Sequence, residues 1–125
     1  MKPKILLGDD NAGYRKSCKR FISMSTEFDV DEASTPSELA EKAQSGGYVG
    51  IITDLDYGEG QETGGIKAIE RIRRAGIKTP ILLQSGTLTE KSVDEAKKAG
   101  ATEVIEKSEI EKLREALEKL KEAGK

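Results

Sequence analysis

Short apolar segments alternate with amphipathic segments five times along the chain, and this alternation limits its fold more than any other feature. The apolar segments are too short for buried helices and are typical of strands. They lie at residues 4–8, 28–33, 49–53, 80–84 and 103–106. Parallel strands need crossover connections, and helices usually supply them. The pattern therefore predicts a parallel sheet covered by helices on both faces, a three-layer α/β sandwich.

Helix-start and helix-stop residues bound the predicted helices. In segment 35–38, a threonine and a glutamate three residues apart predict a capping box, with proline at the first helical position. Thr89 is expected to cap a helix over 90–99, and Gly100 is expected to end it. Ser108 and Glu111 predict a second capping box, before the final helix.

The chain length favours one domain, residues 1–125, with an open doubly wound sheet. A closed α/β barrel needs about twice this length, and hydrophobic residues make up 35% of the sequence, enough for one core. The start of the chain has no apolar run that fits a signal peptide, and no segment approaches a spanning helix. We therefore expect a cytoplasmic protein without membrane contact.

Composition excludes several kinds of functional site. The chain has no histidine, which excludes Ser-His-Asp triads, histidine-ligated metals and a phosphohistidine of its own. Its single cysteine, Cys18, excludes an internal disulfide and is expected to be a packing residue in a reducing compartment. A net charge of −2 gives no general attraction to nucleic acid. Any chemistry must therefore use carboxylates, hydroxyls, lysines and backbone amides.

Polar residues that could supply this chemistry follow four of the predicted strands. The carboxyl ends of parallel strands meet at one edge of a sheet, where ligands bind. The residues expected there are Asp9, Asp10, Asp54, Asp56, Ser85 and Lys107. Carboxylates about 4 Å apart repel by about 1 kcal/mol in water and about 4 kcal/mol at an effective dielectric near 20. A hard cation makes such a cluster favourable, and Mg²⁺ is the natural candidate.

The same set of residues suits phosphoryl transfer. A carboxylate beside magnesium can accept a phosphoryl group, while a lysine and a hydroxyl stabilise the other phosphoryl oxygens. Each residue also has a simpler interpretation: the segment 9–11 as a helix cap, Asp54 and Ser85 as turn residues, and Lys107 as a solvated charge. Their common placement at carboxyl ends favours a site.

Four sequence strings carry a resemblance to a known family. They are "KILLGDDN", "IITDLD", "ILLQSG" and "VIEKS", which occur in that order at four strand ends. Together they resemble the CheY-like receiver domains of response regulators in two-component signalling. The resemblance implies a flavodoxin/CheY-like sheet of five parallel strands in the order 2-1-3-4-5, with five helices.

The resemblance also implies a role for each site residue. Asp54 would be phosphorylated, and Mg²⁺ would be held by Asp9, Asp10, Asp54 and the backbone carbonyl of Asp56. Ser85 would hydrogen-bond the phosphoryl group, and Lys107 would pair with it. Ser85 and residue 104 would be the switch positions.

The sequence departs from the family pattern at three points. Val104 stands where the family usually has an aromatic switch residue, and Ser108 stands where a proline commonly follows the lysine. The loop 55–65 lacks the common Met-Pro and is longer by about three residues. Its aspartate and glutamates make it acidic, and its glycines are expected to make it flexible.

The leading functional hypothesis is a stand-alone phosphoacceptor, not an enzyme, in a phosphorelay. Its donor would be a sensor histidine kinase or a histidine-containing phosphotransfer protein, and its output would be a change in contacts with an unidentified protein rather than nucleic acid. One alternative is a degenerate receiver that binds proteins without phosphorylation. A second alternative is a phosphatase, because Asp54-Leu55-Asp56 resembles the Asp-x-Asp motif of haloacid-dehalogenase-type enzymes.

Overall fold

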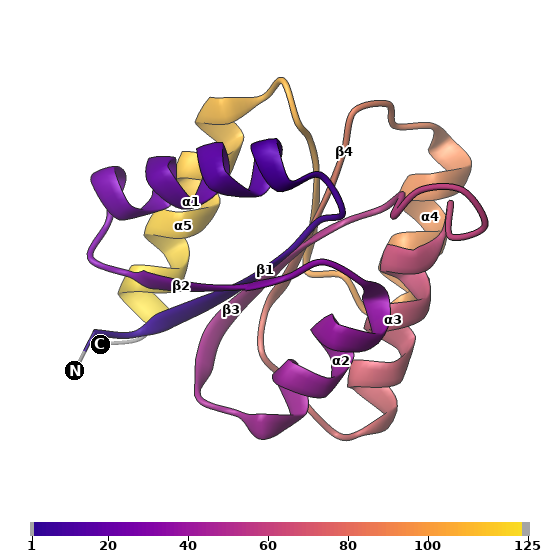
Figure 1. The fold of residues 1–125 in the computed structure, drawn as a ribbon, viewed down its shortest axis with the longest axis horizontal. Coiled ribbons are helices and arrows are strands. Elements are labelled where there is room, and N and C mark those ends of the chain that lie inside the picture. The colour runs from indigo at the N-terminus through magenta and orange to yellow at the C-terminus, as the bar shows by residue number, and fades with distance from the viewer. Residues whose placement is uncertain (1, 124–125) are drawn as a thin grey trace.

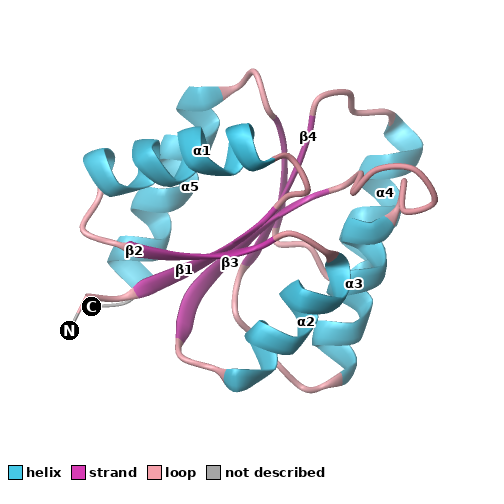
Figure 2. Ribbon diagram, in the orientation of Figure 1, coloured by secondary structure: helices cyan, strands magenta, loops and turns pink. Residues whose placement is uncertain are grey.

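The computed structural model describes residues 2–123 and contains one parallel sheet of five strands in the order β2-β1-β3-β4-β5. The strands are β1 (Lys4–Gly8), β2 (Asp29–Ala33), β3 (Tyr48–Asp54), β4 (Ile81–Ser85) and β5 (Glu103–Glu106). The helices are α1 (Ala12–Ser25), α2 (Pro36–Ser45), α3 (Gly64–Arg74), α4 (Glu90–Ala99) and α5 (Ile110–Ala123). The predicted fold class and strand order are confirmed (Figure 2).

The helices form two layers, one on each face of the sheet. Helices α1 and α5 cover one face, and α2, α3 and α4 cover the other (Figure 1). Side chains alternate between the two faces along each strand. In β4, for example, Leu82 belongs to the core beneath α1 and α5, whereas Ile81 and Leu83 belong to the core beneath the other helices. The predicted three-layer sandwich thus has two separate hydrophobic cores.

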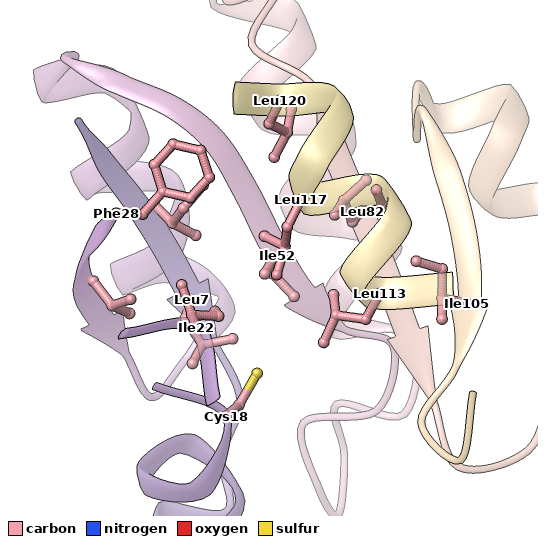
Figure 3. Close-up of a cluster of buried hydrophobic side chains, with 13 residues drawn as sticks. Leu7, Cys18, Ile22, Phe28, Ile52, Leu82, Ile105, Leu113, Leu117 and Leu120 are labelled. Atoms are coloured by element: carbon pink, nitrogen blue, oxygen red, sulfur yellow. The ribbon is translucent and has the colours of Figure 1, made fainter. Parts of the chain in front are cut away.

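The core beneath α1 and α5 is built from apolar side chains at helical spacing, which pack against the strands. Cys18 and Ile22 of α1 are buried in it, as is Leu117 of α5. Figure 3 shows the leucines of α5 facing strand side chains such as Ile52. Cys18 is a packing residue, as expected, and burial raises the pKa of its thiol to about 11.

The first two helices begin at the residues that the sequence indicated. The side chain of Asn11 caps α1 by accepting a hydrogen bond from the backbone N–H of Tyr14. Thr35 caps α2 by accepting from the N–H of Glu38. The Glu38 carboxylate, however, accepts from the N–H and hydroxyl of Ser34 rather than from Thr35. The predicted reciprocal bond is therefore displaced by one residue toward the N-terminus.

Thr89 caps α4 as predicted, and it does so in a capping box with Ser92. Gly100 ends this helix with a φ of 122°, a backbone conformation that favours glycine. Within residues 2–123, none of the helices combines the length and the apolar character needed to cross a membrane.

The capping box predicted for α5 is wrong. The helix begins at Ile110, so Glu109 occupies the cap position and Ser108 precedes it. The Glu109 carboxylate accepts a hydrogen bond from the N–H of Glu106 and so closes the turn after β5. Lys107 and Ser108 lie in this turn, so the helix begins only after it.

The loop between β3 and α3 is held by its own hydrogen bonds and by one buried aromatic ring. The backbone N–H of Tyr57 donates to the carbonyl of Gln61, whose N–H donates to the carbonyl of Gly58. Tyr57 is only 5% exposed, and its hydroxyl lies 2.8 Å from Oγ1 of Thr53. Gly65 belongs to α3, where a Cβ would overlap the carbonyl oxygen of Asp54. This glycine therefore allows α3 to start directly against the end of β3.

Candidate functional site

The carboxyl ends of the strands form an open cleft with a volume of about 480 Å³. All six polar residues predicted for this edge line it: Asp9, Asp10, Asp54, Asp56, Ser85 and Lys107. The cleft is also lined by Asn11, Glu62 and Thr87. Val104 lies elsewhere, in a separate groove between α4, β5 and α5. The two expected switch positions are thus in different surface hollows.

Three carboxylates meet in the cleft. Asp9, Asp10 and Asp54 each place one carboxylate oxygen within 4.8 Å of the others, and they are the group in residues 2–123 that could share one metal ion. Asp9 and Asp54 are buried at 1% and 6% exposure, whereas Asp10 is exposed. Oxygen ligands of this kind suit Mg²⁺, which also retains several waters. The donor set therefore fits the predicted metal.

Lys107 bridges two of these acids. Its Nζ lies 2.9 Å from Oδ2 of Asp9 and 3.3 Å from Oδ2 of Asp54. Burial opposes the charged ammonium, but the hydrogen bond to Asp9 and the charge of Asp54 outweigh it, so the pKa of Lys107 is raised. The ammonium therefore stays positive and partly neutralises the two buried carboxylates.

Asp54 remains a weaker acid than a solvated aspartate despite this pairing. Burial of its carboxylate, followed by the nearby charge of Asp9, raises the pKa of Asp54 from 3.8 to about 6, while Lys107 opposes the shift. The carboxylate is still mostly ionised at neutral pH. The ionised carboxylate therefore lowers the stability of the folded protein. A bound cation or a chemical modification of Asp54 would relieve this cost.

The Asp56 side chain belongs to the loop rather than to the carboxylate cluster. Its Oδ1 accepts a hydrogen bond from the N–H of Gly58. The phosphatase hypothesis needs this carboxylate as an acid or base beside Asp54, and its bond to the loop backbone does not favour that role. The backbone N–H of Asp56 lowers the pKa of Asp54 slightly by hydrogen bonding.

Ser85 is engaged in the turn that follows β4. Its hydroxyl donates to the carbonyl of Thr87 at 2.8 Å and accepts from the N–H of the same residue at 3.2 Å. The serine lies at the cleft, but its hydroxyl would have to leave this turn to bind a group on Asp54.

Three residues at the site were missed by the sequence interpretation. The ring centroid of Tyr14 lies 4.1 Å from Nζ of Lys107, and its hydroxyl donates to Oε1 of Gln84 at 3.1 Å. Arg15 donates from Nη1 to the carbonyl of Asp9 at 2.7 Å. In the sequence, Tyr14 has the helical spacing of an apolar packing residue relative to Cys18, and Arg15 lies beside it on the basic face. Gln84 was the available sequence signal, because it is an isolated amide at the end of an apolar strand. The structure shows it 2% exposed.

Comparison with known proteins gives a consistent result. A family model described as "Response regulator receiver domain" matches residues 5–118. The chain is similar to a response regulator receiver protein from Pseudoalteromonas atlantica, with a TM-score of 0.88 and 18% identity over 98% of this chain and 100% of that one. It is similar to the chemotaxis protein CheY4 of Vibrio cholerae, with a TM-score of 0.79 and 24% identity over 96% and 99%.

A third similar structure is a Burkholderia pseudomallei response regulator with a phosphorylated aspartic acid, a calcium ion and citrate. The TM-score is 0.74 and the identity 22%, over 85% of this chain and 60% of that one. No curated protein matches the sequence. At these identities the solved structures establish the fold, and the family match covers most of the chain.

Proposed function

The chain belongs to the response regulator receiver domain family, and from this premise we propose that it accepts a phosphoryl group on Asp54 and thereby changes its contacts with other proteins. One observation carries the proposal. Lys107 contacts the carboxylates of both Asp9 and Asp54 in a cleft that Asp10 also lines. A buried nucleophile, a fixed positive charge and a metal-binding acid are the parts that phosphoryl transfer to a carboxylate needs.

The chemical step balances without any further reactant. A carboxylate oxygen of Asp54 attacks the phosphorus of a donor such as acetyl phosphate and forms a new P–O bond. The P–O bond to acetate breaks, and acetate leaves with the electron pair. A pKa of about 6 keeps Asp54 ionised at neutral pH, and therefore nucleophilic. The ammonium of Lys107 lies close enough to Asp54 to stabilise the charge on the phosphoryl oxygens.

Magnesium would be held by Asp9, Asp10 and Asp54 together with the backbone carbonyl of Asp56. When bound, it would neutralise the clustered carboxylates and ligate a phosphoryl oxygen. The cation and phosphorylated aspartic acid in the Burkholderia structure support this assignment. The side chains of Asp9 and Asp54 are already buried at the strand ends. The protein would therefore hold these ligands in place before the ion binds.

The response would begin at Ser85. Its hydroxyl would exchange its bonds within the turn to Thr87 for a bond to the phosphoryl group, and the turn between β4 and α4 would shift with it. This turn leads into α4, which borders the groove between α4, β5 and α5. Val104 lines that groove. We assign the contacts with other proteins to this face. We assign the role of phosphoryl donor to a histidine kinase or a phosphotransfer protein, because the chain itself has no histidine.

The proposal is tested by incubating the whole chain with Mg²⁺ and acetyl phosphate and measuring its intact mass. We expect the added mass of one phosphoryl group, absent without metal and absent in Asp54→Asn. Asp29→Asn, an exposed acid at the start of β2, is the matched control and should be modified like the wild type. An unmodified wild type, under conditions that modify another receiver, would overturn the proposal in favour of the degenerate receiver, which the valine at position 104 favours.

A further inference from the structure

Lys107 has a third neighbour besides the two acids, and that neighbour is aromatic. Its Nζ lies over the face of the Tyr14 ring, 4.1 Å from the centroid. Tyr14 is half-buried near the start of α1 and packs against the core beneath α1 and α5. A cation over an aromatic face is attracted by the electrons of the ring, more strongly when the pair is shielded from water.

The Tyr14 ring is itself held from the other side. Its hydroxyl donates to Oε1 of Gln84 at 3.1 Å. Gln84 is 2% exposed and pairs in register with Asp54 on the neighbouring strand. Because paired residues of adjacent strands point to the same face, Tyr14 covers the sheet next to Asp54. The hydrogen bond fixes the orientation of the ring that Lys107 contacts.

We propose that Tyr14 is a positioning residue for Lys107, held in place by Gln84. The ring confines the ammonium to the space where it reaches both Asp9 and Asp54. Without the ring the long lysine side chain would gain rotamers directed to solvent, and fewer molecules would have the charge in place when the phosphoryl group arrives. This inference rests on the proposed function of Asp54.

The first test compares rates of phosphoryl acquisition from acetyl phosphate at saturating Mg²⁺. Tyr14→Leu should slow the reaction about three- to tenfold, as expected for losing one partly shielded cation–π contact. Tyr14→Phe keeps the ring and should be slowed less. Tyr48→Phe is the matched control, because it removes a tyrosine hydroxyl bonded to Asp31 at the opposite end of the sheet, and should match the wild type.

A second test separates positioning from a general structural role. If Tyr14 acts through Lys107, then Tyr14→Leu should cause no further slowing in a Lys107→Met background. Equal slowing in both backgrounds, or a wild-type rate in Tyr14→Leu, would overturn the inference. A wild type that acquires no phosphoryl group would instead overturn the proposed function.

The contact also has a readout that needs no phosphorylation. The NMR signals of the Lys107 side-chain methylene next to Nζ should be shifted upfield by the Tyr14 ring. They should move to ordinary lysine positions in Tyr14→Leu, move less in Tyr14→Phe, which keeps the ring without its bond to Gln84, and stay in place in Tyr48→Phe. Ordinary positions in the wild type would contradict the contact even if Asp54 is phosphorylated.

Discussion

The Tyr57 hydroxyl lies 2.8 Å from Oγ1 of Thr53, in a space that exists because residue 8 is glycine. A Cβ at Gly8 would overlap Oη of Tyr57 and lie 2.8 Å from Cδ1 of Leu39. The end of β1, directly before Asp9, is thereby packed against the loop that follows Asp54.

Gly8→Ala is therefore expected to destabilise the protein by about 1–3 kcal/mol, because the surrounding side chains are buried and must shift. Urea denaturation followed by circular dichroism measures the change. Gly86→Ala is the control, since a Cβ there meets no atom within 4 Å. Adding Tyr57→Phe to Gly8→Ala should recover part of the loss. Unchanged stability in Gly8→Ala would show that this contact is not tight.

Asp54→Asn should stabilise the metal-free protein at neutral pH by about 1–3 kcal/mol, because it removes a charge that burial disfavours. The raised pKa of Asp54 sets the pH dependence. Its contribution to stability is complete below pH 3.8, the ordinary value, and is lost as pH rises through about 6. The melting temperatures of the two proteins should be similar at the acidic end of this range and diverge toward pH 6. A constant difference would contradict the assigned cause.

Magnesium should raise the melting temperature of the wild type, because a ligand that binds only the folded state stabilises it. Asp10→Asn should reduce this increase by removing one of the three clustered carboxylates. Glu59→Gln, an exposed acid in the loop between β3 and α3, is the control and should keep the full increase. If Asp10→Asn and the wild type respond equally, the metal binds elsewhere.

Arg73→Lys should cost about 1–3 kcal/mol, because the guanidinium of Arg73 donates to three backbone carbonyls that one ammonium cannot reach together. The acceptors are the carbonyls of Gly100, Ile77 and Thr79. Thermal unfolding of Arg73→Lys beside Arg74→Lys, an exposed neighbour, measures the difference. Similar stabilities would show that these four hydrogen bonds to three carbonyls add little.

The architecture could be predicted from the sequence because the apolar strand segments and the helix caps give local signals, the weakest of them at segment 28–33. The predicted segment 4–8 coincides with β1, and segment 103–106 coincides with β5. The cleft residues followed from the rule that parallel strands end at one edge, which depends on topology and not on side-chain detail. The family resemblance is confirmed by the match over residues 5–118.

The missed features depend on contacts between residues far apart in the chain. Tyr57 belongs to the loop 55–65, which was expected to be acidic and flexible, and only the space beside Gly8 makes its burial understandable. Tyr14 had the spacing of a core residue, and its contact with Lys107 joins residues from α1 and the end of β5. The capping box at Ser108 failed because the preceding turn already uses Glu109. Local patterns do not contain this information.

The alternation of side chains along the strands divides the site between the two faces of the sheet. Asp54 has the parity of Ile52, on the side of α1 and α5, whereas Ser85 has the parity of Leu83, on the side of α2, α3 and α4. The sheet separates its two faces, and residues from both faces line the cleft at the strand ends. Sequence changes in either outer layer can alter one helical surface while leaving the opposite core intact, so the two surfaces can diverge independently.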